Sequence, residues 1–475
     1  MKVLSLIFLT TTLFAEPLSE STSLSSESAD YNGNTLILKG QVVLDHGLGK
    51  MMAEQAFLEK QEAGKDFPFS FIRLQNQVSV QMPNRSELQC ETADLDFVAL
   101  KGVLYPKDQD KVTYIDNENQ NVRLMSDKIE LEMSKAGFDG KKTAYAVQSL
   151  FANGDVIIDY AKVFTLRADH AHYTKGDKQQ GIITAHPKEN MSCRLMHEGD
   201  LIEANTIRFD LGSSKLSFDH PKGVLNTPLV PDVQKGEISF SSDLLLWDHL
   251  KNTLVLKGKV HIQEPSLGKI DSDGAIQIIQ AKNKGKRTLK SIRSNGKTVL
   301  EYEDAGKVAH KLVAHGPFFL DSDHLRVSIE SPENALTKKL QIAYNEAELA
   351  VFADKAFLEY ALVDESLQPV SLTLKGNVRL FSHDRNQPAF CGLSDRVVFS
   401  PATKTLILSA DPSKKVLFWD EGQGLHVSSQ EIHVTQDPAT KQKAVKGIGN
   451  VKFAFTPEED TMLHQHFSFY KVSNE

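Results

Sequence analysis

The stretch Asn34-Thr-Leu-Ile-Leu-Lys-Gly-Gln-Val42 decides the fold, because it returns almost unchanged as Asn252-Thr-Leu-Val-Leu-Lys-Gly-Lys-Val260. Seven of the nine residues are identical. In both copies, apolar residues alternate with other residues on either side of a central glycine. Alternation with a period of two is typical of a β-strand with one buried face.

Further copies of this pattern run through the chain. Residues 150–158 and 372–380 repeat it around Gly154 and Gly376, residues 72–80 carry Asn76 at the centre, and residues 445–453 form a looser copy. A strand that is rebuilt many times indicates a stacked β-architecture rather than a globular enzyme with one site. We expect the central glycine where the strand bends or where another backbone approaches.

A second motif, a small residue followed by a polar one, recurs together with the first. Ala53-Glu54-Gln55-Ala56-Phe57-Leu58-Glu59 returns as Ala353-Asp354-Lys355-Ala356-Phe357-Leu358-Glu359, with five of seven residues identical. This match favours a strand over residues 350–360, although residues 336–360 have a composition that would also suit a helix. Weaker copies recur at roughly 30–50-residue spacing, within the range of repeat architectures.

The N-terminus has the features of a secretory signal. Lys2 supplies a positive charge, and residues 3–15 form an apolar stretch too short to span a membrane. We therefore expect a signal peptide over residues 1–15 and an exported protein. Residues 16–30 hold six serines and are predicted to be a flexible lead-in. The long self-match predicts two tandem segments, 31–235 and 236–475.

Composition and cysteine content exclude several classes of protein. The formal net charge of −8 argues against general binding of nucleic acid. The three cysteines, Cys90, Cys193 and Cys391, are odd in number and far apart, so they do not form a disulfide framework. We expect them to be inert, partly buried thiols.

Signals for catalysis and metal binding are weak. Gly296-Lys297-Thr298 resembles the end of a phosphate-binding loop but has Ser291 where the motif needs glycine. Asp271-Ser-Asp273-Gly274 opens like a calcium loop but has Lys282 in place of the final glutamate. The pairs His170/His172 and His464/His466 have no third ligand at a diagnostic spacing, and Glu301/Glu303 form an undiagnostic carboxylate pair. We predict no catalytic residue, no metal and no cofactor.

These repeats resemble the OstA-like module shared by LptA, LptC and the periplasmic part of LptD. The resemblance is carried by Ala29-Asp30-Tyr31, by Leu36-Ile-Leu38-Lys-Gly40-Gln-Val42 and by Met52-Ala53-Glu54-Gln55-Ala56. It implies an all-β fold, an elongated β-jellyroll solenoid (a folded taco) of stacked antiparallel strands around an apolar groove. It also implies a non-catalytic periplasmic protein that carries lipopolysaccharide toward the outer membrane.

The same resemblance implies partners. These are related jellyroll transport proteins, which pair head to tail through edge strands, and an outer-membrane barrel. The chain is more than twice the size of the usual bridging subunit, so its role as a bridge or as an outer-membrane-associated subunit stays open.

The residues expected to line the groove are the apolar members of the main repeats, which point to one side of each strand. They are Leu36, Leu38, Val42, Leu44, Ile72, Leu74, Val78, Leu150, Val156, Ile158, Leu254, Leu256, Val260, Ile262, Leu372, Leu374, Val378 and Leu380. A basic cluster at Lys282, Lys284, Lys286 and Arg287 is the candidate contact for lipid headgroups or a membrane surface. Two alternatives remain: a structural β-solenoid with a filled core and no lipid ligand, and a carbohydrate-active β-helix enzyme.

Overall fold

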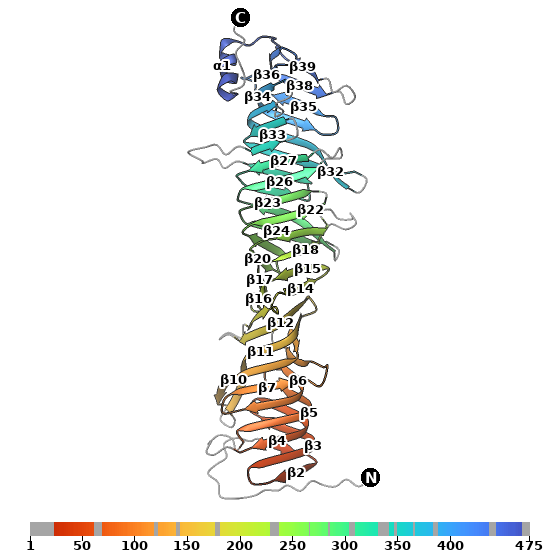
Figure 1. Cartoon of the computed structure of the whole chain (residues 1–475), viewed down its shortest axis with the longest axis vertical. Coiled ribbons are helices and arrows are strands. Elements are labelled where there is room, and N and C mark those ends of the chain that lie inside the picture. The colour runs from red at the N-terminus through yellow and green to blue at the C-terminus, as the bar shows by residue number, and fades with distance from the viewer. Residues whose placement is uncertain are drawn as a thin grey trace. The chain divides into compact units, whose positions relative to one another are not determined.

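The prediction of an all-β fold built from stacked antiparallel strands is confirmed. The computed structural model describes residues 23–60, 69–117, 122–138, 143–175, 181–228, 237–265, 267–283, 286–303, 309–330, 342–345, 349–363, 366–382, 388–436 and 443–467. Within this part of the chain, every regular element except one helix is a β-strand (Figure 1). The signal-peptide prediction for residues 1–15 lies outside the described residues.

The chain divides into two compact units. Unit 1 contains the residues up to His197 together with Asn205–Ser214, and unit 2 contains Glu198–Ala204 together with the residues from Lys215 onward. The division therefore falls near residue 200, earlier than the boundary expected at residue 235. Pro228, near that expected boundary, lies inside unit 2, where its carbonyl accepts a hydrogen bond from the backbone N–H of Leu289 at 3.0 Å.

Unit 1 is a stack of antiparallel strands (red to yellow in Figure 1). Its strands are β1 (Ser23–Ser25), β2 (Ser28–Tyr31), β3 (Thr35–His46), β4 (Gly49–Glu59), β5 (Phe71–Gln81), β6 (Glu87–Asp96), β7 (Lys101–Tyr105), β8 (Val112–Asp116), β9 (Val122–Ser126), β10 (Lys128–Phe138), β11 (Thr143–Tyr160), β12 (Phe164–Lys175), β13 (Gly181–His186), β14 (Cys193–His197) and β16 (Thr206–Asp210).

Unit 2 is a second stack of the same kind. Its strands are β15 (Asp200–Ala204), β17 (Lys215–Asp219), β18 (Lys222–Asn226), β19 (Glu237–Ser241), β20 (Leu244–Asp248), β21 (Thr253–Lys257), β22 (Val260–Glu264), β23 (Gly268–Ser272), β24 (Ile276–Asn283), β25 (Lys286–Ser294), β26 (Thr298–Glu303), β27 (Ala309–Ala314), β28 (Phe318–Asp321), β29 (Arg326–Glu330), β30 (Ile342–Asn345), β31 (Leu349–Ala353), β32 (Lys355–Val363), β33 (Ser366–Ser382), β34 (Phe390–Ser400), β35 (Thr405–Ser409), β36 (Val416–Asp420), β37 (Leu425–Ser429), β38 (Glu431–Gln436) and β39 (Lys443–Ile448).

The pairing of strands separates unit 2 into two ladders. Ladder A runs β17-β20-β21-β24-β25-β28-β29-β32, and ladder B runs β15-β18-β19-β22-β23-β26-β27-β30-β31. The chain forms a hairpin of two strands in one ladder, crosses to the other ladder, and forms the next hairpin there. Both ladders reach β33, whose first part pairs with β32 and whose last part pairs with β31. The long strands of unit 1 behave in the same way: β3 pairs with β2 and then, beyond a bend, with β1.

The glycine of the main repeat lies where the chain passes from one ladder to the other. Gly258 separates β21 from β22 with φ +70°, and Lys259 follows with φ +40°. Gly376 and Asn377 bend β33 with φ +80° and +47°. Both residues of each pair are in the left-handed region, which glycine enters without strain and most other residues do not. The expectation that the central glycine marks a bend is confirmed.

The second motif explains why the glycine has no side chain. The Asp243 backbone N–H donates to the carbonyls of Lys257 and Gly258 at 3.1 and 3.0 Å, which places its carboxylate over Gly258. The same contact joins Asp354 to Gly376. A Cβ atom on Gly376 would meet the Asp354 carboxylate at 2.7 Å, closer than real Cβ contacts. The two motifs therefore recur together because they are the two halves of one corner.

The two edges of the ladders therefore differ in how the chain connects the strands there. We call the side that carries these bends the corner edge, because the described passages between the ladders lie there. The opposite side, the turn edge, consists of the hairpin turns within each ladder, such as residues 249–252 between β20 and β21 of ladder A. At the turn edge, the ladders meet through side-chain and backbone contacts between hairpins.

Two further sequence predictions can now be compared with the structure. Residues 350–360 lie in β31 and β32, which confirms the strand expected there. The flexible lead-in predicted over residues 16–30 is corrected for its described part, because Ser23–Ser25 and Ser28–Tyr31 are the strands β1 and β2. Serine is tolerated in them because both strands are exposed at the end of the stack and are held by backbone pairing with β3.

Helix α1 (Pro457–His466) packs against β34 and β36. Leu463, together with Phe467 just beyond the helix, forms a buried cluster with Cys391, Leu417 and Trp419. A capping box between Thr456 and Glu459 fixes the start of the helix. Among the described residues, no helix is long and apolar enough to cross a membrane.

All three cysteines are free thiols, and burial raises the pKa of Cys90, Cys193 and Cys391 to about 12. At neutral pH they are therefore protonated, which lowers their reactivity because the thiolate is the nucleophile.

The corner predicts a specific stability effect. Gly258→Ala adds the left-handed strain of about 1–2 kcal/mol and also drives a methyl group into the Asp243 carboxylate. Gly424→Ala is the matched control, because Gly424 has φ +59° and no atom within 4 Å of the added methyl. In urea unfolding, Gly258→Ala should lower stability clearly more than Gly424→Ala, and Asp243→Ala should recover part of the difference. Equal effects of the two alanines would contradict the role of Asp243.

Candidate apolar binding interior

The predicted groove residues share one face of the strands, and that face is buried. Of the eighteen residues predicted, all but Leu36 are between 0 and 3% exposed. Leu36, near the N-terminal end of the stack, is half-buried. The sequence therefore placed these side chains on the correct side of each strand, and in this structure they are packed against other side chains.

Strand register brings these residues together across each ladder. In ladder A, Leu256 lies opposite Leu245 on one side and Ile276 on the other. In ladder B, Ile262 lies opposite Phe240 and Ile270. Cross-strand neighbours on one face are about 5 Å apart, so each ladder presents a continuous apolar surface to the interior.

The sequence analysis named only a minority of this surface. The missed residues lie on strands that pair with the repeats and that alternate without a central glycine. They include Leu58, Leu95, Leu104, Ile129, Leu245, Trp247, Ile270, Ile276, Ile278 and Leu358, all buried. Period-two alternation alone was the signal that could have found them.

Aromatic rings bridge the two sides of the interior in unit 1. The Tyr160 ring meets Phe209 edge-on with centroids 4.7 Å apart, and Phe164 meets the same ring at 5.2 Å. Tyr160 and Phe164 come from strands β11 and β12, whereas Phe209 comes from β16. These rings fill the space between strands at this level.

Contacts at the turn edge hold the two sides of unit 1 together. The Tyr173 hydroxyl donates to Asp116 Oδ2 at 3.1 Å, and the Tyr145 backbone N–H donates to the Gly47 carbonyl at 3.0 Å. The Tyr145 ring also stacks on His46 at 5.2 Å. Each contact joins a strand to a hairpin on the opposite side.

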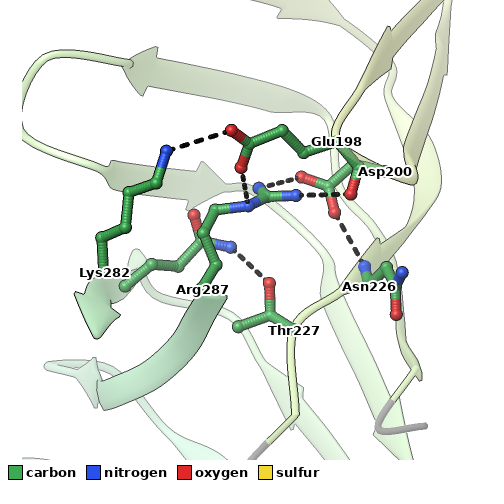
Figure 2. A network of polar contacts seen from close by, with 7 residues as sticks. Glu198, Asp200, Asn226, Thr227, Lys282 and Arg287 are labelled. Carbon is green, nitrogen blue, oxygen red and sulfur yellow. Dashed lines mark hydrogen bonds and ion pairs between the residues drawn. The ribbon is translucent and has the colours of Figure 1, made fainter. Parts of the chain in front are cut away.

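A buried polar network joins the two ladders of unit 2. Figure 2 shows Arg287, at the start of β25 in ladder A, reaching Glu198 and Asp200 beside β15 in ladder B. Arg287 Nε lies 2.9 Å from Glu198 Oε2, and Nη1 donates to Asp200 Oδ2. The side chains of Arg287 and Asp200 are only 4% and 3% exposed.

Two further bonds complete the network. Asp200 Oδ1 also accepts the Asn226 backbone N–H at 2.7 Å, and Gln280 Nε2 donates to Thr227 Oγ1 at 2.8 Å (Figure 2). The network therefore joins the hairpins of ladder A to those of ladder B.

This network corrects the prediction for Arg287. A headgroup or membrane contact must reach the surface, whereas Arg287 is buried and paired with two carboxylates. Lys282 is exposed and pairs with Glu198 at 3.2 Å, so it remains available at the surface. Lys286 begins β25, and Lys284 lies outside the described residues. The predicted cluster is not a single basic surface.

The weaker sequence signals lie in ordinary structural surroundings. His170 Nδ1 is 3.0 Å from Asn153 Oδ1, the His172 ring stacks on Phe151 at 4.0 Å, and Glu301 pairs with Lys311 at 2.7 Å. Asp273 is a corner residue that accepts the Lys297 backbone N–H. Within the described ranges, no group of three or more His, Cys, Asp or Glu side chains is arranged to hold a metal ion.

The burial of Arg287 leads to a testable difference. Arg287→Met leaves Asp200 charged and buried without its main partner, which should destabilise the protein by about 3–5 kcal/mol. Lys282→Met removes an exposed ion pair and should change stability by less than about 1 kcal/mol. Urea unfolding of the two variants measures this contrast. Equal, small effects would show that Arg287 is a surface residue.

Comparison with known proteins assigns the chain to no family. No protein-family profile matches the chain. No curated protein matches its sequence. A proposal of function therefore rests on the fold and on the residues described above.

Proposed function

We propose that this protein is a non-catalytic periplasmic carrier that binds the acyl chains of lipopolysaccharide between its two ladders and passes the lipid toward the outer membrane. The proposal joins the OstA-like resemblance of the repeats to the topology of the strands. The signal-like segment at residues 1–15 supports export.

One observation carries the proposal: the two apolar faces are linked through the chain at the corner edge, whereas at the turn edge they meet through non-covalent contacts. Such a pair of sheets can part along the turn edge without breaking a strand. An acyl chain could then enter from the side while its polar headgroup stays in water.

The interior is apolar enough to retain a lipid. Burial of each methylene contributes about 0.8 kcal/mol, so a chain of about twelve carbons gains on the order of 9–10 kcal/mol. Because each ladder repeats the same apolar rung, a lipid moving within a unit keeps nearly the same contact energy. Passage therefore needs no chemical step on the lipid.

The N-terminal end of the stack supports pairing with a related protein. Strands β1 and β2 are exposed, and in the described part of the chain each pairs with β3 on one side. An exposed strand edge can accept the strand of another sheet. We propose head-to-tail contact at this end with a like jellyroll protein, one of a series that leads to an outer-membrane barrel.

The second candidate function is a structural β-solenoid with a filled core. The burial of the interior residues, at 0–3% exposure for nearly all of the predicted set, favours this alternative. The two functions differ in whether the ladders separate to admit a ligand.

Photocrosslinking separates the two functions. A photoreactive amino acid placed at Leu256 or Leu374, which are both 1% exposed, should form an adduct with lipopolysaccharide in cells that make it. Val255 and Thr373 are the matched controls, since each is the preceding residue on the same strand and faces outward. Adducts from the interior positions, with few from the controls, support the carrier.

The opposite result has an equally clear meaning. If neither interior position yields an adduct while the variants remain folded, the interior does not take up lipid, and the scaffold function replaces the carrier.

A further inference from the structure

A cavity of about 450 Å³ lies where helix α1 meets β33, β34 and β36. Its walls include Arg379 of β33, Ser394 of β34, Lys415 just before β36, and Met462 and His466 of α1. Arg379 lies opposite Leu393 in the strand register, and Leu393 packs against the cluster that α1 covers. Arg379 and Leu393 therefore face outward, whereas Ser394 lies opposite Val378, an interior residue that also borders the cavity.

The cavity carries excess positive charge. Lys414 pairs with Asp395 at 2.6 Å, and Asp395 is the one carboxylate among the lining residues, all of which the structure describes. Burial alone would raise the pKa of Asp395, but hydrogen bonds from Lys414 and from the Asp411 backbone outweigh it and lower the pKa. One lysine is thus neutralised, and the charges of Arg379 and Lys415 are not balanced by a carboxylate in the wall.

Two polar atoms in the wall are buried without a hydrogen-bond partner. They are Arg379 Nε and Ser394 Oγ, and Ser394 is only 8% exposed. Most buried polar groups in native proteins have a partner, so a donor left unpaired among the described residues and beside a cavity is available to a ligand. Of the two, Arg379 Nε is on the outward-facing side chain, and a guanidinium N–H can donate to an oxyanion.

Neighbouring residues hold the guanidinium of Arg379 in place. Nη1 lies 3.5 Å from His466 Nδ1, and the guanidinium carbon lies 5.7 Å from the centre of the Phe352 ring. Burial, together with the charge of Arg379, lowers the pKa of His466. His466 is then neutral at pH 7 and can accept a hydrogen bond from Arg379.

We propose that this cavity binds a phosphate group carried on a larger molecule, with Arg379 and Lys415 contacting the phosphate oxygens. The volume exceeds that of a bare phosphate, and the apolar side chains of Leu417 and Met462 provide a surface for the rest of the ligand. A soluble sugar phosphate and a phosphorylated lipid headgroup share this chemistry. The site does not depend on the carrier proposal, because Arg379 faces outward and Lys415 is half-exposed.

Calorimetric titration of the full-length protein tests the site. The probes are inorganic phosphate, glucose 6-phosphate and vesicles of phosphatidylcholine with or without phosphatidic acid. Binding of glucose 6-phosphate but not of vesicles would identify a soluble phosphate ligand, and binding of phosphatidic-acid vesicles alone would identify a headgroup. Either result supports the site if Arg379→Gln and Lys415→Gln each weaken binding at least tenfold while Lys446→Gln, an exposed lysine on β39, does not.

Two outcomes overturn the proposal. One is that no probe binds; the other is that Arg379→Gln and Lys415→Gln bind as well as the parent protein. If Arg379→Gln only lowers the unfolding temperature, its role is to complement the carbonyl end of α1. Lys415→Gln keeps the test decisive if the arginine variant does not fold, because Lys415 is half-exposed.

Discussion

The corner between the two ladders is the constraint on which the rest of the structure depends. At each well-formed corner, a glycine in the left-handed region turns the chain from one ladder to the other, and an acidic residue from the neighbouring corner lies over it. The backbone N–H of that acidic residue, as at Asp243 and Asp354, donates to the carbonyl of the glycine. One corner therefore fixes the position of the next, and the spacing of the strands follows.

This arrangement concentrates the chain connections on one side and leaves the other side to weaker contacts. A closed barrel would have no such asymmetry, because its strands pair all the way around. Here the two ladders need contacts of their own at the turn edge, and these include the Tyr173–Asp116 bond in unit 1 and the Arg287–Asp200 pair in unit 2. A buried ion pair often adds little net stability, because desolvation of the two charges offsets their attraction. Its value at this place is to hold the hairpins of the two ladders in one register.

The sequence predicted the local features well and the long-range ones poorly, for a physical reason. Alternation and the central glycine are encoded within nine residues, so the faces of Leu256 and Leu374 and the bend at Gly258 could be derived from the sequence. The burial of Arg287 could not, because its partners Glu198 and Asp200 lie almost ninety residues away. From sequence, Arg287 was indistinguishable from Lys282, which is exposed.

The strands β1 and β2 show the same limit in another form. Their serines gave no apolar signal, because a strand at the end of a stack is held by the backbone of β3 and buries little of its own surface.

The packed interior and the carriage of lipid are compatible only if opening is confined to the turn edge. Separation there breaks side-chain contacts and a few hydrogen bonds, while every corner and every strand pair within a ladder is kept. Opening at Arg287 would also break a buried ion pair, whose loss usually costs about 3–5 kcal/mol. Levels without such a polar contact are therefore less costly to open than the level of Arg287. The apolar residues that face the interior are alike throughout each unit. If lipid is carried, its path of entry therefore follows the distribution of the polar contacts between the ladders.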